Sequence, residues 1–194
     1  MTEVVGILLA AGSARRFGAP KLLHPLHDGV PIAVVAAHAL MQALPHTIVV
    51  VKPGDHALIE TFTQLGLEIA KNPLAEEGMG TSLAAGVNAT ASAGGWLIML
   101  ADMPWVQPAT ISALADRIKN GASIIAPVYA GQRGHPVGFS SRWLQSLQGL
   151  SGDKGAQDLL TKYPDELELL ATEDDGVLKD IDRPQDLVID LGLK

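Results

Sequence analysis

The amino-acid sequence predicts an α/β fold whose parallel β-sheet is covered by helices on both faces. Apolar runs alternate with amphipathic segments along the chain, which is the pattern of sheets built from strand–helix–strand units. The 194 residues suit one domain with a sizeable core, so a single domain over residues 1–194 is expected. Hydrophobic residues make up 47% and charged residues 18% of the chain, which indicates a globular protein.

The first two thirds of the chain carry a signal for each element. The run Val4–Leu9 is wholly apolar and the run Thr47–Lys52 is rich in β-branched residues, as expected of buried strands. Pro45 ends the helix between them. A later helix begins with Pro108, at the position where helices favour proline. The expected strands are Val4–Leu9, Thr47–Lys52, Leu67–Lys71, Trp96–Ala101 and Ser123–Pro127, and the expected helices are Pro31–Leu44, Asp55–Leu65, Gly80–Ala91 and Pro108–Lys119.

The pattern changes after Pro127. Residues 128–136 contain two glycines and a proline, so a loop or an irregular hairpin is expected there. Short helices and edge strands are expected to complete the chain. The expected helices are Ser141–Leu147, Gly155–Tyr163 and Pro184–Leu191, and the expected edge strands are Glu166–Ala171 and Val177–Asp180.

Charge and composition narrow the class of ligand. The net charge is -7 with only three Phe, two Tyr and three Trp, so a basic, stacking face for nucleic acid is not expected. No apolar run approaches the roughly 18 residues of a membrane span. The chain has no cysteine, which excludes disulfides and thiolate metal sites. We expect a cytoplasmic protein that binds a small anionic ligand and contacts neither nucleic acid nor membrane.

The segment Leu8–Leu23 is the strongest functional signal. A buried strand enters a turn of small residues that carries Arg15, Arg16 and Lys21, and residues 4–27 contain no acidic side chain. Small residues let backbone N–H groups approach an anion, and the cations neutralise it. The glycine patterns of Walker A and of dinucleotide-binding loops are both absent. The segment therefore predicts a polyphosphate site and disfavours a hydride-transfer enzyme.

Asp102 follows the most apolar of the expected strands. A carboxylate there is costly unless it is paired or binds a cation. One interpretation is an aspartate that caps the turn before Pro104. The alternative is a metal ligand, because Mg²⁺ is usually held by one or two carboxylates together with phosphate oxygens. Ligands of open α/β sheets bind beyond the carboxyl ends of strands, so we favour a metal site at Asp102.

Three further segments leave two interpretations open. Thr81 or Ser82 either caps a helix or contributes to a ligand site at the helix N-terminus. Arg133 and His135 lie on a glycine-rich loop that either binds a second anionic substrate or is a solvated hairpin tip. Asp182 either caps the last helix or belongs to a site.

These segments together resemble the nucleotidyltransferases that attach a nucleotide to molybdopterin, and among them the molybdenum cofactor cytidylyltransferases most. The motifs run in order over nearly the whole chain, and the resemblance implies a three-layer, doubly wound, mostly parallel mixed sheet of Rossmann-like type. The motifs are Leu9-Ala-Ala-Gly, Arg16-Phe-Gly, Lys21, Gly78-Met-Gly-Thr-Ser-Leu, Leu100-Ala-Asp-Met-Pro, His135-Pro, Gly152-Asp-Lys-Gly-Ala and Asp180-Ile-Asp-Arg-Pro-Gln-Asp-Leu.

The resemblance also implies roles for single residues. Arg16, Lys21 and Asp102 would be catalytic, and Asp102 with Asp182 would bind Mg²⁺, or Mn²⁺ in its place. The candidates for acceptor binding come from the loop itself and not from the resemblance: they are Arg133 and His135. The implied nucleotide contacts are Leu9, Ala10, Ala11, Gly12, Ser13, Lys21, Gly80 and Ser82.

The loop itself favours one nucleotide. Its Ala-Ala-Gly form resembles the cytidine enzymes, whereas the guanosine enzymes usually have Ala-Gly-Gly, and the methyl group of Ala11 is expected to favour a pyrimidine. Ala14 departs from the serine of many relatives, which puts one hydrogen bond to phosphate in doubt.

The implied reaction transfers CMP from CTP to the phosphate of molybdopterin and releases pyrophosphate. The second pKa of a phosphate is about 6, so the attacking group is ionised at neutral pH and needs no general base. Three alternatives stay open: GTP as donor or a sugar or polyol phosphate as acceptor, a non-catalytic protein that delivers cofactor to a molybdoenzyme, and an oxidoreductase.

Overall fold

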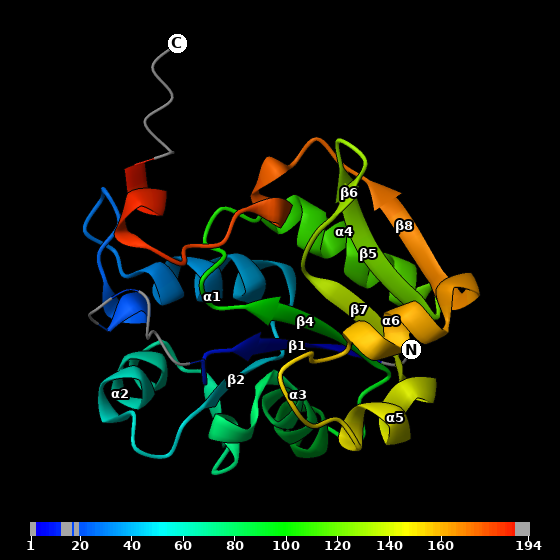
Figure 1. Ribbon diagram of the computed structural model, residues 1–194, viewed down its shortest axis with the longest axis horizontal. Coiled ribbons are helices and arrows are strands. Elements are labelled where there is room, and N and C mark those ends of the chain that lie inside the picture. Colours follow the sequence, from blue (N-terminus) through cyan, green and yellow to red (C-terminus); the bar gives the residue numbers. More distant parts are fainter. Residues whose placement is uncertain (1–2, 13–16, 18–19, 189–194) are drawn as a thin grey trace.

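The computed structural model describes residues 3–12, 17 and 20–188, and it places one mixed, mostly parallel sheet between two layers of helices (Figure 1). The strand order is β3-β2-β1-β4-β7-β5-β6, and β8 pairs with β5. The expected doubly wound architecture is thereby confirmed. The strands are β1 Val4–Leu9, β2 Thr47–Val51, β3 Glu68–Lys71, β4 Gly95–Leu100, β5 Ile124–Tyr129, β6 Gln132–Arg133, β7 Val137–Ser140 and β8 Leu167–Ala171.

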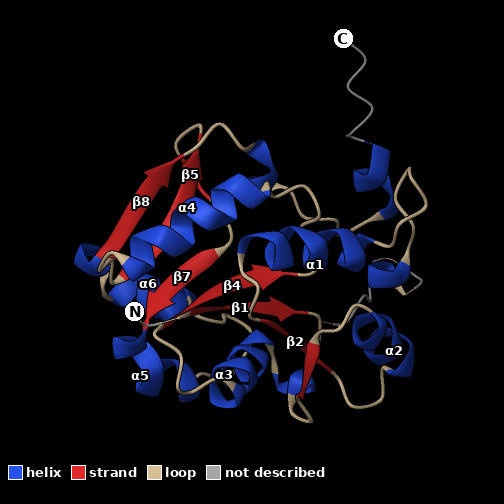
Figure 2. Cartoon of the chain, turned by 180° about the vertical axis from the view of Figure 1, so that it is seen from behind, coloured by secondary structure: helices blue, strands red, loops and turns tan. Residues whose placement is uncertain are grey.

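The helices divide between the two faces of the sheet. One core cluster joins the sheet to α1, α2 and α4, and a second joins its other face to α3, α5 and α6. Seen from behind, α1 and α4 lie together over one face, with α3 and α5 on the other side of β1 and β4 (Figure 2). The helices are α1 Ile32–Ala43, α2 His56–Gln64, α3 Met79–Ala89, α4 Pro108–Lys119, α5 Leu144–Gln148 and α6 Gln157–Lys162.

Local signals in the sequence explain where several elements begin. Every residue of β1 is buried, as a strand covered on both faces requires. The Asp55 side chain accepts a hydrogen bond from the Leu58 N–H at 3.4 Å and caps α2, and α4 begins at Pro108. Among the described residues, no helix combines the length and the apolar character that crossing a bilayer requires.

Three expectations for the last third of the chain differ from the structure. The expected hairpin forms between β5 and β6, but β7 was not expected; it pairs antiparallel with both β4 and β5. Residues 177–180 are not an edge strand. A 3₁₀ turn, Asp175–Leu178, stands there because the Asp174 side chain accepts from the Gly176 N–H at 3.0 Å. Within the described residues the closing segment is likewise a 3₁₀ helix, Pro184–Val188.

The sheet order determines where a ligand can bind. Strand β1 pairs in parallel with β2 on one side and with β4 on the other, and Leu9 lies opposite Leu100 at their carboxyl ends. The chain reaches β2 through α1 on one face and returns from β3 through α3 on the opposite face. Loops that leave such a switch point diverge and leave a crevice between them.

Candidate functional site

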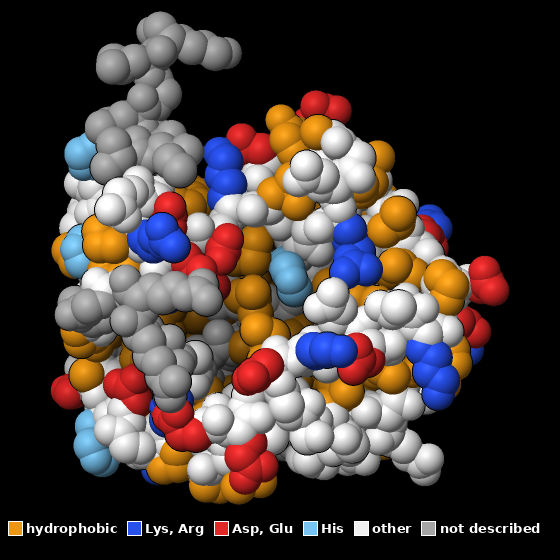
Figure 3. All heavy atoms as spheres, viewed as in Figure 1, with side chains coloured by type: hydrophobic (Ala, Val, Ile, Leu, Met, Phe, Trp, Pro, Cys, Tyr) orange, Lys and Arg blue, Asp and Glu red, His pale blue; other side chains and the backbone are white. Residues whose placement is uncertain are grey.

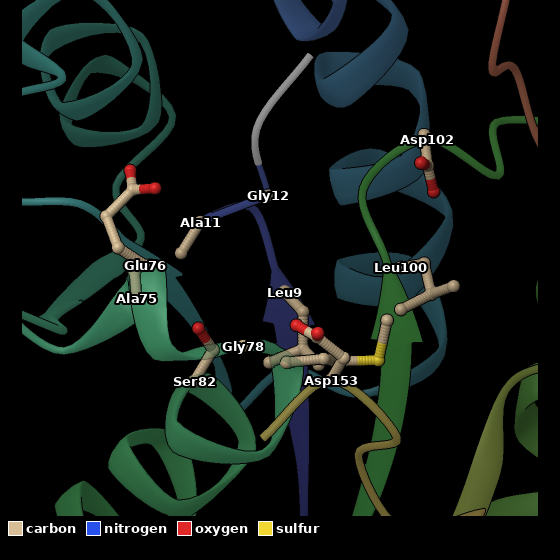
Figure 4. Close-up of a pocket in the computed structure, with 11 residues that line it drawn as sticks. Leu9, Ala11, Gly12, Ala75, Glu76, Gly78, Ser82, Leu100, Asp102 and Asp153 are labelled. Carbon is tan, nitrogen blue, oxygen red and sulfur yellow. The ribbon is translucent and has the colours of Figure 1, made fainter. Parts of the chain in front are cut away.

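A cavity of about 380 Å³ opens at this switch point. Leu9, Ala11 and Gly12 line it from the end of β1, and Asp102 lines it beyond the end of β4 (Figure 4). Ala10 directly follows β1 but faces the core under α1, and its N–H donates to Val50 O at 2.9 Å. Leu9 and Ala11 therefore face the cavity on either side of Ala10, as extended backbone dictates, and Gly12 continues the cavity wall.

The start of α3 forms the opposite wall. Gly78, Met79 and Ser82 line the cavity there. The Asn72 amide donates to Ser82 Oγ at 3.0 Å. Since that oxygen already accepts, the Ser82 hydroxyl is placed to donate its proton to a ligand. The N-cap of α3 is Gly78, so neither Thr81 nor Ser82 is the cap.

Gly80 supports this wall without lining the cavity. Its N–H donates to Gly152 O at 2.8 Å, and a Cβ at Gly80 would lie 2.6 Å from Ser151 O. Gly78 has φ +117, and a Cβ there would overlap the carbonyl carbon of Gly152. Both glycines therefore let the turn around residues 151–153 pack directly on the first turn of α3.

We expect Gly78→Ala to destabilise the fold by about 2–5 kcal/mol, because it adds overlap with Gly152 to the strain of a positive φ. Gly121→Ala is the matched control: Gly121 has φ +102, but nothing lies within 4 Å of an added Cβ, so about 1–3 kcal/mol of strain is expected alone. Urea unfolding of both variants measures the difference. Equal losses in the free energy of unfolding for the two variants would show that the turn around residues 151–153 moves away from the added Cβ at no cost.

A cluster of carboxylates lies at the Asp102 end of the cavity. Asp102, Asp180 and Asp182 each place an oxygen within 4.8 Å of the others. Lys21 Nζ lies 2.7 Å from Asp102 Oδ2 and 3.5 Å from Asp182 Oδ1. Burial, with the charges of Asp102 and Asp182, raises the pKa of Asp180. Asp102 is therefore an ion-paired group in this cluster.

This oxygen-only cluster fits a hard divalent cation. Mg²⁺ and Mn²⁺ favour carboxylate oxygens, and the three carboxylates lie around a single ammonium group, that of Lys21. The segment that carries Asp182 is fixed to the short helix after it, because Asp186 Oδ2 accepts from the N–H groups of Asp182 and Arg183 at 2.9 and 2.7 Å.

A second cavity of about 240 Å³ adjoins the first and shares Leu9, Met79, Leu100 and Asp153 with it. Its walls are mostly apolar side chains of β4, β7, α3 and α6. The cationic side chains that line it are those of Arg133 and Lys154, and His135 adds an imidazole. Figure 3 shows this hollowed face, with hydrophobic side chains at the centre and charged side chains around them.

His135 is half-buried in the wall of the second cavity and lies outside the hairpin of β5 and β6. The backbone N–H of His135 donates a hydrogen bond to the backbone oxygen of Val177 at 2.9 Å. Its ring Nδ1 is buried and has no hydrogen-bond partner among the described residues. Burial and the charge of Arg133 lower the pKa of His135, partly opposed by Asp102. At neutral pH the imidazole is therefore neutral, with one nitrogen that accepts and one that donates.

The lowered pKa of His135 predicts acid sensitivity. Its contribution to the free energy of unfolding is present above the unfolded value of 6.5 and is lost as the pH falls through the lower folded value. Wild type should lose more stability than His135→Gln between about pH 7.5 and about pH 5.5 in denaturant unfolding. His27→Gln, at an exposed histidine, should behave as wild type. Identical pH profiles for all three would contradict the prediction.

Two predicted site residues, Ser13 and Arg16, lie outside the described residues, as does Ala14. Two carboxylates were not singled out by sequence reasoning. Asp180 is two residues from Asp182, a spacing that brings side chains to one side of an extended segment. Asp153 lies in a short turn between helices. It belongs to the motif Gly152-Asp-Lys-Gly-Ala, but the sequence pattern assigned no role to its carboxylate.

Known proteins are similar to this chain over most of its length. The family model described as MobA-like NTP transferase domain matches residues 6–167. Purine catabolism protein PucB of Bacillus subtilis is 31% identical over 94% of this chain and 93% of its own length. Nicotine blue oxidoreductase of Paenarthrobacter nicotinovorans is 28% identical over 92% of both.

Solved structures show the same likeness. Rv0371c of Mycobacterium tuberculosis has a TM-score of 0.84 at 29% identity, covering 95% of both chains. A complex of Rv0371c with manganese has a TM-score of 0.79 at 28% identity, covering 95% of this chain and 96% of that one.

Proposed function

This chain belongs to the MobA-like NTP transferase family, and on that premise we propose that it transfers CMP from CTP to the phosphate of molybdopterin and releases pyrophosphate. The observation that carries the proposal is the pair of adjoining cavities beside one carboxylate cluster. Such a transfer needs two substrates side by side, with their reacting phosphates close to a cationic centre.

The first cavity is proposed to hold the nucleotide. Leu9, Ala11, Gly12 and Ser82 line it, and Ser13, the next residue after Gly12 in the sequence, is proposed to contact the nucleotide with them. The methyl group of Ala11 takes up space at the cavity wall, which favours the smaller pyrimidine base. This supports CTP over GTP.

The carboxylate cluster is proposed to hold Mg²⁺ or Mn²⁺ through Asp102 and Asp182, with Asp180 beside them. When bound, the cation would neutralise charge on the phosphate oxygens. Manganese in the Rv0371c structure supports a divalent cation in a relative.

The chemistry needs positioning and positive charge more than proton transfer. An oxygen of the acceptor phosphate forms a bond to the α-phosphorus, the bond from the α-phosphorus to the bridging oxygen breaks, and pyrophosphate leaves with that electron pair. The attacking phosphate has a pKa of about 6 and is ionised already. Lys21 and Arg16 are proposed to stabilise the charge on the α-phosphate and on the leaving pyrophosphate.

The second cavity is proposed to hold the acceptor. Arg133 and His135 are the groups there that can bind its phosphate, and Asp102 is near enough to affect the pKa of His135. The product would pass to a molybdoenzyme. A sugar or polyol phosphate would leave the apolar walls of the cavity unused, which supports a less polar acceptor.

Pyrophosphate release with each of the four nucleoside triphosphates, with and without molybdopterin and Mg²⁺ or Mn²⁺, tests the proposal. Release that requires CTP, molybdopterin and the metal is expected. Release with GTP instead would change the donor. Nucleotide binding without release under every condition would favour a carrier. NADH and NADPH oxidation is followed in parallel, because one relative is named an oxidoreductase.

A further inference from the structure

Asp153 is a carboxylate in the wall shared by the two cavities, and the chemistry above gives it no role. Figure 4 shows its side chain between those of Ser82 and Leu100. Among the described residues it has no hydrogen-bond or ion-pair partner. Asp153 is exposed and lines both cavities, so its carboxylate is accessible to a ligand in either one.

The charges around Asp153 indicate which ligand it serves. On the nucleotide side, Glu76 and Asp102 already supply carboxylates, and another one repels a triphosphate. On the other side, Asp153 is the one acidic residue among those that line the second cavity, where Arg133 and Lys154 are cationic. It is therefore the strong hydrogen-bond acceptor that this cavity offers to N–H groups.

The backbone holds Asp153 in place. Gly152 and Gly155 flank it with φ +72 and φ +55. The turn is fixed to α3 because Gly80 N–H donates to Gly152 O at 2.8 Å and because Gly78 lets the two backbones meet. A carboxylate on such a turn can recognise a ligand with little loss of backbone entropy.

We propose that Asp153 reads the nitrogen-bearing edge of the acceptor's ring system, accepting hydrogen bonds from a ring N–H and the adjacent amino group. The two oxygens of a carboxylate match such a pair of parallel donors. The cavity volume of about 240 Å³ and its apolar walls suit a flat, fused heterocycle. The acceptor would then lie with its ring at Asp153 and its phosphate toward Arg133, His135 and Asp102. This inference rests on the proposed function.

The test compares two ligands. Pterin carries an amino group beside a ring N–H, and lumazine carries a carbonyl oxygen in place of that amino group. Isothermal titration of the full chain should show that wild type binds pterin about 10-fold to 100-fold more tightly than lumazine. Asp153→Asn should abolish or reverse this preference, because its amide offers one acceptor and one donor.

Asp165→Asn is the matched control, since Asp165 is an exposed aspartate that lines neither cavity; it should keep the wild-type preference. CTP affinity is measured in all three proteins: it should be unchanged in Asp165→Asn and no weaker than wild type in Asp153→Asn, which removes a negative charge from the shared wall. An Asp153→Asn variant that weakens CTP binding and keeps the preference for pterin would overturn the inference, as would wild type that binds neither ligand. If CTP- and molybdopterin-dependent pyrophosphate release stays normal in Asp153→Asn, the inference fails while the proposed function stands.

Discussion

Asp102→Asn is expected to lower kcat for pyrophosphate release by about 100-fold to 1000-fold, the usual loss when a group that stabilises transition-state charge is removed. Asp102 is the member of the carboxylate cluster that also lines the first cavity, the proposed nucleotide site. Asparagine keeps its shape but not its charge, so cation binding should weaken together with turnover. Titration with Mn²⁺ in the absence of nucleotide measures that loss independently of activity.

The fold should tolerate this change. Asparagine removes a charge that helps raise the pKa of Asp180, which offsets the loss of the ion pair to Lys21 at 2.7 Å. Asp175→Asn is the control, because Asp175 pairs with Lys179 at 2.8 Å and lines neither cavity. Normal Mn²⁺ affinity and normal kcat in Asp102→Asn would remove the carboxylate from the proposed mechanism.

The strands and helices that the sequence predicts best are those with local signals. Strand β1 is an unbroken apolar run, and α4 begins with a proline; both have the predicted bounds, Val4–Leu9 and Pro108–Lys119. Strand β7 has four residues, one of them Gly138, and exists because β4 and β5 pair with it. Only the tertiary structure supplies those partners.

The residues of the candidate site also differ in whether a local sequence pattern predicts them. Asp102 could be predicted because it follows an apolar strand, and Ala11 and Gly12 because they begin the loop after β1. The pairing of Lys21 with Asp102 joins residues 81 positions apart, and no local pattern specifies it. Asp153 could not be placed either, because its position depends on contacts between its turn and the start of α3.

Lys21→Met is expected to lower kcat by a similar factor, about 100-fold to 1000-fold, since methionine keeps the apolar stem and removes the cation. Its effect on cation binding should be the opposite of that of Asp102→Asn. Lys21 Nζ already lies among the carboxylates, 2.7 Å from Asp102 and 3.5 Å from Asp182. Without nucleotide, a divalent cation must compete with this ammonium group, so its removal should tighten Mn²⁺ binding.

Thermal unfolding distinguishes the two variants. Metal-free Lys21→Met should have a lower Tm than wild type, because the carboxylates lose their counter-charge, and Mn²⁺ should raise its Tm by more than it raises that of wild type. Lys179→Met, which removes the exposed ion pair to Asp175, should respond to Mn²⁺ as wild type does. Weaker Mn²⁺ binding in Lys21→Met would mean that the lysine assists the cation instead of competing with it, and the carboxylates alone could not then form the site.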